Sequence, residues 1–124
     1  MNGRSMNRTL TVEDLVKQFL SVALAQYDAI HFLNNEKYSR LYAQMQNIRD
    51  GLKCMDGDQR RALLPLLRHS NVQVRLMAAN TLLAIVPESA RKTLEGVRDS
   101  GIQPQCADAS GMIRALEDGS FNPK

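Results

Sequence analysis

The sequence contains no tryptophan and few other aromatic residues, with three tyrosines and three phenylalanines among its 124 residues. It has six methionines and many leucines and alanines. Strands are usually enriched in aromatic and β-branched residues, whereas Leu, Met and Ala favour helices. The composition therefore predicts an all-helical protein. Its length suits one domain, and its balance of 44% hydrophobic and 23% charged residues is typical of a globular chain.

Cysteine and long apolar runs are also scarce. Two cysteines, Cys54 and Cys106, are too few for a disulfide scaffold, and we interpret both as reduced, buried or half-buried thiols. No apolar run approaches the roughly 18 residues of a membrane-spanning helix. The first apolar stretch, residues 15–24, follows two acidic residues and is interrupted by Lys17 and Gln18, unlike a secretory signal. The sequence therefore predicts a cytoplasmic protein without a membrane span.

The residue patterns that carry catalysis, metals or nucleotides are missing. His31 and His69 stand far apart, without an H-x-x-x-H, C-x-x-C or paired-carboxylate motif. The seven glycines are scattered, so there is no glycine-rich phosphate loop. We expect both histidines to be structural helix-end residues; a nucleophilic pair of Cys54 and His69 is a less favoured alternative that requires the fold to join them. The sequence therefore predicts no enzyme, no catalytic residue, no metal site and no cofactor.

Apolar residues recur at three- and four-residue steps through the first half of the chain, the pattern of amphipathic helices. They predict a helix that begins at Thr11, with Asp14 completing a capping box, and a second helix after the Asn34-Asn35 pair. Residues 1–9 lack this periodicity and are expected to be a flexible lead-in. Residues 10–121 are expected to form the single domain.

The second half of the chain carries clear helix boundary signals. Asp58 is the expected N-cap of a third helix, which Pro65 should shorten or bend. Residues 72–86 are apolar on two faces, so this segment should be a central helix with neighbours on both sides. Pro87 is placed to open a fifth helix, and Gly119 to end a final helix around residues 107–118.

Residues 63–85, with the sequence L-L-P-L-L-R-H-S-N-V-Q-V-R-L-M-A-A-N-T-L-L-A-I, resemble a HEAT-type helical repeat. Arg75 falls on the arginine of the repeat, but His69 replaces the aspartate six residues earlier that usually bonds it. Over residues 10–121 the order of segments also resembles a family of small bacterial proteins with HEAT-like helices and no assigned function. The resemblance implies five or six antiparallel helices, stacked as a short HEAT- or armadillo-like α-solenoid, and supplies no catalytic residues.

Positive charge is concentrated in the middle of the chain. The formal net charge is +3, and residues 37–75 hold eight basic against three acidic side chains. These charges are either solvated helix ends or one basic face for an acidic protein or for phosphates. We predict the latter kind of surface, with Arg40, Arg60, Arg61 and Arg68 steering an acidic partner.

The predicted function is a non-catalytic protein–protein interaction module, with toxin neutralisation and enzyme regulation as fitting tasks, because small bacterial helical-repeat proteins often serve as binding partners. The alternative is a weak nucleic-acid or phosphate-backbone binding module. Nucleic acid is less favoured because the positive charge is modest and the few aromatic residues fall mostly on apolar stripes.

Overall fold

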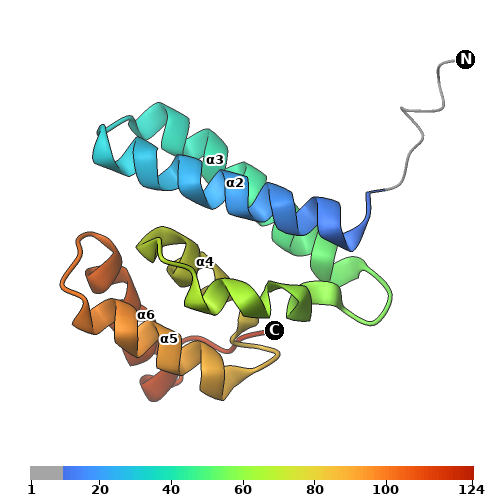
Figure 1. Cartoon of the computed structure of the whole chain (residues 1–124). Helices are drawn as coiled ribbons and strands as arrows, with labels where there is room; N and C mark the ends of the chain where they lie inside the picture. The colour runs from blue at the N-terminus through green and yellow to red at the C-terminus, as the bar shows by residue number, and fades with distance from the viewer. Residues whose placement is uncertain (1–9) are drawn as a thin grey trace, which may run out of the picture.

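The computed structural model describes residues 10–124, which fold into six helices and no strand (Figure 1). The all-helical prediction is confirmed, whereas the predicted lead-in of residues 1–9 lies outside the described residues. The helices are α2 (Val12–His31), α3 (Asn35–Cys54), the 3₁₀ helix η1 (Gln59–Arg68), α4 (Val72–Leu82), α5 (Pro87–Asp99) and α6 (Gln105–Asp118).

Antiparallel neighbours form two layers around α4 (Figure 1). The α2–α3 pair lies across one side of α4 and η1, and the α5–α6 pair packs on the other side. Eight of the eleven residues of α4 are buried, as expected for a helix that is apolar on two faces. The central position predicted for this helix is confirmed. Its buried residues are Val72, Gln73, Val74, Leu76, Ala78, Ala79, Thr81 and Leu82.

Short-range hydrogen bonds fix the helix starts where the sequence placed them. The hydroxyl of Thr11 accepts from the backbone N–H of Asp14 at 3.0 Å, and the Asp14 carboxylate accepts from the backbone N–H of Thr11 at 3.0 Å. Asn34 caps α3, and Asp58 caps η1. Each cap satisfies a backbone N–H that the first helical turn leaves without a partner.

Pro65 explains the unusual third helix. Proline has no N–H and its ring clashes with an α-helical backbone, so it cannot sit inside an undistorted α-helix. The segment forms a ten-residue 3₁₀ helix with Pro65 inside it. The predicted distortion is therefore present, as a tighter helix along the whole segment.

Arg75 ties η1 to α4. Its Nη1 donates to the backbone carbonyl oxygen of His69 at 2.9 Å and to that of Ser70 at 3.1 Å. The residue six positions before Arg75, where the resembling repeat has an aspartate, thus still bonds the guanidinium, here through a main-chain oxygen. In the same turn, Nδ1 of His69 accepts from the backbone N–H of Asn71 at 3.0 Å.

A row of three buried glutamines crosses the core from α2 through α4 to α6. Gln26, Gln73 and Gln105 are each 1% exposed or less. Nε2 of Gln73 donates to Oε1 of Gln26 at 3.2 Å, and Nε2 of Gln105 donates to Oε1 of Gln73 at 2.9 Å. Within residues 10–124, the two outer atoms of the row, Nε2 of Gln26 and Oε1 of Gln105, have no partner. Gln73 of α4 therefore links the α2–α3 pair to the α5–α6 pair, because it forms one hydrogen bond with Gln26 and one with Gln105.

The two cysteines differ in their exposure. Cys54 is exposed at the end of α3, so its predicted burial is wrong, whereas Cys106 is half-buried and both thiols are free. Leu52 of the same turn is fully buried, so Cys54 lies on the solvent-facing side of the end of α3. None of the helices between residues 10 and 124 has the length and hydropathy that a membrane crossing requires.

Candidate functional site

The four arginines selected from the sequence occupy three different environments. Arg40 lies on α3 with its side chain 64% exposed, and its Nη1 is 3.3 Å from Oε1 of Glu36. Arg61 and Arg68 are exposed on η1. Arg60, also on η1, is only 8% exposed. The structure therefore separates the buried Arg60 from its exposed sequence neighbour Arg61 and from Arg68 on the same helix.

Arg60 is held in place by a carboxylate two residues earlier. Its Nε and Nη2 donate to the two carboxylate oxygens of Asp58 at 2.8 and 2.6 Å, and Nη2 also donates to the backbone oxygen of Lys124 at 3.2 Å. The hydrogen bond to Asp58 raises the pKa of Arg60, and the same bond lowers the pKa of Asp58. Because this bidentate pair occupies and neutralises Arg60, the side chain is not an exposed steering contact.

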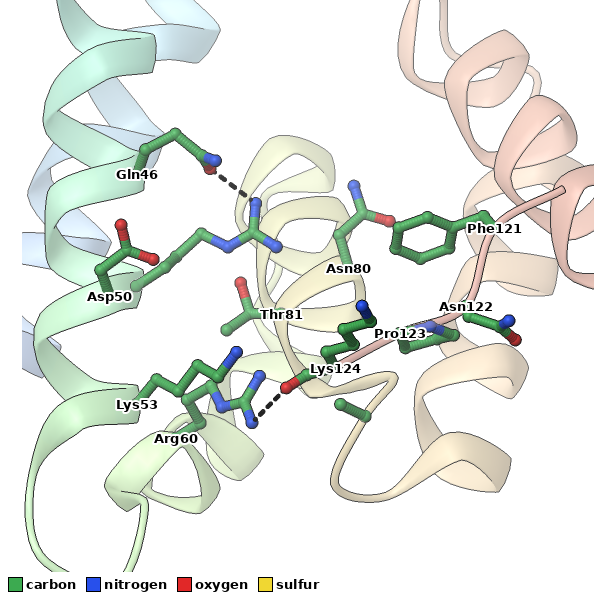
Figure 2. A pocket seen from close by; sticks show the side chains of 12 residues that line it. Gln46, Asp50, Lys53, Arg60, Asn80, Thr81, Phe121, Asn122, Pro123 and Lys124 are labelled. Atoms are coloured by element: carbon green, nitrogen blue, oxygen red, sulfur yellow. Dashed lines mark hydrogen bonds between the residues drawn. The ribbon is translucent and has the colours of Figure 1, made fainter.

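Arg60 lines a polar cavity of about 250 Å³, which we call the α3–α4 pocket (Figure 2). One wall is formed by α3 and another by α4, and residues 121–124 close a third side. The lining combines basic and amide side chains with the folded-back Phe121. Its residues are Gln46, Arg49, Asp50, Lys53, Arg60, Asn80, Thr81, Ala84, Phe121, Asn122, Pro123 and Lys124.

Arg49 is the notable cation of the α3–α4 pocket. Its Nη1 donates to Oε1 of Gln46 at 2.9 Å, drawn as a dashed line in Figure 2, and it forms no ion pair within residues 10–124. Desolvation by burial is the main influence on Arg49 and lowers its pKa, although Asp50 acts in the opposite direction. A half-buried guanidinium with a neutral acceptor alone is an unsatisfied charge that an anion would stabilise.

A second depression, the η1–α5 groove, has a volume of about 470 Å³ and a different character. Leu64, Pro65 and Leu67 supply apolar surface from η1, and Arg68 lies on the same helix. Lys92 is on the facing helix α5, where Ser89 and Thr93 add hydroxyl groups. No ion pair within the described part of the chain involves Arg61, Arg68 or Lys92. The groove thus joins an apolar lining to cations that form no ion pair in the described residues, although Glu88 and Glu95 lie with Lys92 around an adjoining depression.

The alternative nucleophilic pair is not assembled in either depression. Neither Cys54 nor His69 lines the α3–α4 pocket or the η1–α5 groove. Among residues 10–124, no three His, Cys, Asp or Glu side chains are grouped in a way that would hold a metal ion.

Comparisons with known proteins identify the family of this fold. Residues 13–117 match the family described as "Domain of unknown function (DUF2019)". The chain belongs to this family. The chain is also similar to a crystal structure, that of protein RPA1889 from Rhodopseudomonas palustris CGA009, with 43% sequence identity and a TM-score of 0.91 over 94% of this chain and 96% of that chain. No curated protein matches the chain.

Membership of DUF2019 confirms that the chain belongs to a family without an assigned function, as the order of segments indicated. The function is therefore inferred from the α3–α4 pocket and the η1–α5 groove. Two residues that line these depressions could hardly be selected from the sequence: Arg49 in the α3–α4 pocket and Lys92 in the η1–α5 groove. Arg49 was one of several helical cations, and only its packing between α3 and α4 makes it special. Lys92 lies outside the basic middle of the chain and joins Arg68 only because α5 packs against η1.

Proposed function

We propose that this chain is a non-catalytic protein-binding module of the cytoplasm, arranged as a short HEAT-like solenoid, and that it binds an acidic partner through the η1–α5 groove. The observation that carries the proposal is the combination of Leu64 and Pro65 with the unpaired cations Arg68 and Lys92 in one depression. Protein interfaces typically have an apolar centre with charged groups at the rim.

The groove has the properties that specific binding needs. Both walls are helices, so a partner is bound without ordering of loops, which keeps the entropic cost of association low. Arg61 extends the positive surface along the exposed side of η1. Cations at a rim mainly accelerate encounter with an acidic surface, whereas apolar contacts sustain the complex when salt is added.

Toxin neutralisation and enzyme regulation are the two tasks that fit such a module, because both require occlusion of a partner surface and no chemistry by the module itself. The alternative, backbone binding of nucleic acid, also uses unpaired cations. Salt separates the two, because affinity for phosphate backbones falls steeply with salt.

The test is an affinity pull-down of the tagged protein from its native lysate, with and without nuclease, at low and moderate salt. The variants are Arg61→Glu with Arg68→Glu, and Lys17→Glu as a control, since Lys17 is an exposed cation of α2 outside the groove. We expect a stoichiometric protein that survives nuclease and moderate salt, is retained by the control and is lost by the double reversal. Recovery of nucleic acid that disappears with nuclease would contradict the proposal and support the alternative.

A further inference from the structure

The α3–α4 pocket leaves cationic donors free on Arg49 and Lys53, together with one buried acceptor, the amide oxygen of Asn80. Arg49 uses one N–H on Gln46, and Lys53 forms no ion pair with any residue between 10 and 124. The amide oxygen of Asn80 is buried without a partner, and its amide nitrogen is not among the buried unpartnered atoms. The hydroxyl of Thr81 donates its proton to the backbone oxygen of Met77 at 2.8 Å.

The remaining charges in the pocket also favour an anion. Arg60 is compensated by Asp58, which leaves the cations Arg49, Lys53 and Lys124 in the lining with one exposed side-chain carboxylate, that of Asp50. In Figure 2, Lys53 and Arg60 lie toward the same side of the cavity as the chain end at Lys124. Burial of Arg49 strengthens its attraction for an anion, because the local medium screens charge less than water does.

We propose that the α3–α4 pocket binds a single phosphate group, either inorganic phosphate or the phosphate of a small monoester. A phosphate oxygen accepts hydrogen bonds from a guanidinium in a geometry that arginine matches well, and a lysine adds a compact positive charge. Arg49 is the principal ligand, with Lys53 as a further donor. The site is separate from the η1–α5 groove and does not depend on the protein-binding proposal.

The shape of the pocket selects the end of a molecule over a continuous backbone. Residues 121–124 run across the side opposite α3, so the cavity has walls on three sides (Figure 2). A duplex needs an open surface along which successive phosphates are contacted. A terminal phosphate needs one enclosed set of donors, as here.

The experiment is a titration of the full chain with inorganic phosphate and with glycerol 3-phosphate, followed by ¹H–¹⁵N NMR at constant ionic strength. We expect saturable shifts in the amide signals of residues 46–53 and 80–81. Arg49→Gln should raise the dissociation constant by at least about ten-fold, the usual effect of losing a hydrogen bond to a charged group. Arg40→Gln is the matched control, because Arg40 lies on the same helix outside the pocket lining and forms its ion pair with Glu36; the phosphate affinity of this variant should equal that of the wild type.

A second pocket variant and a comparison of the two ligands complete the test. Lys53 is exposed, so Lys53→Gln should fold normally and still weaken binding by about three-fold or more, even if Arg49→Gln proves unstable. Tighter binding of the ester identifies a phosphomonoester as the ligand, and tighter binding of the free ion identifies inorganic phosphate. Absence of a saturable response, or equal affinity in the wild type and in both pocket variants, would overturn the proposal.

Discussion

Gln73 is the residue whose replacement tests the packing argument most directly. It is 1% exposed, donates to Gln26 and accepts from Gln105, and so joins α2, α4 and α6 through side chains alone. In Gln73→Leu the chain keeps a side chain of similar size, so no large cavity forms. The substitution instead leaves Oε1 of Gln26 and Nε2 of Gln105 buried without partners.

The expected cost follows from those two atoms. A buried polar group without a partner costs about 1–3 kcal/mol, and the added apolar burial of leucine offsets part of the total. We therefore expect Gln73→Leu to lower the free energy of unfolding by about 2–4 kcal/mol, a large share of the roughly 5–15 kcal/mol typical of a domain. Replacing Gln26, Gln73 and Gln105 together by leucine removes the unpartnered groups and should restore most of this loss.

Urea unfolding followed by circular dichroism measures these differences, provided that the dependence on urea concentration keeps the same slope in all variants. Gln44→Leu is the control, because Gln44 is exposed on α3, and its effect should stay within about 0.5 kcal/mol. The reasoning is refuted if Gln73→Leu is as stable as this control. It is also refuted if the triple variant is less stable than the single one.

Other predictions concern local features. Arg60 holds the pKa of Asp58 below its ordinary value, so this pair contributes stability that is complete above about pH 4 and is lost as pH falls through the lowered pKa. Unfolding free energies measured from pH 7 to pH 2 should therefore differ between wild type and Asp58→Asn at neutral pH and converge in acid; a constant difference would count against the ion pair. Replacement by alanine should have opposite effects at Gly111, inside α6, and at Gly119, its C-cap, although the added Cβ meets no neighbour at either position. Gly111→Ala should raise the free energy of unfolding by about 0.5–1 kcal/mol, because alanine favours a helix interior. Gly119→Ala should lower it by about 1 kcal/mol, because Gly119 has φ +78°, a conformation that alanine disfavours. Thermal unfolding of both variants checks the signs.

Several helix limits were readable from the sequence because they depend on neighbours within one turn, whereas α4 ends four residues before and α6 begins two residues before the predicted positions. The Thr11 hydroxyl, the Asp58 carboxylate and the missing N–H of Pro65 all act on backbone groups a few residues away. The left-handed conformation of Gly119 likewise ends α6 by a local effect. The apolar character of residues 72–86 on two faces was sufficient to predict that α4 is central, although the helix itself already ends at Leu82.

The candidate sites were only partly readable. Arg68 was selected for its place in a basic segment, and it does line the η1–α5 groove, but the opposing Lys92 comes from a helix further along the chain. Arg60 and Arg61 are neighbours with the same side chain, and only the packing of η1 makes one buried and the other exposed. Identical residue types thus occupy different environments in the structure.

The sequence by itself determined the helices, their caps and the order in which apolar faces meet. The tertiary structure alone decided which polar groups are enclosed: the glutamine row, the ion pair of Arg60 with Asp58, and Arg49. Helix formation is governed by interactions among residues near in sequence, and these leave a pattern. Whether a polar side chain is buried depends on which helix packs over it and on whether that helix supplies a hydrogen-bond partner. The periodicity of residues along one segment contains no information about either.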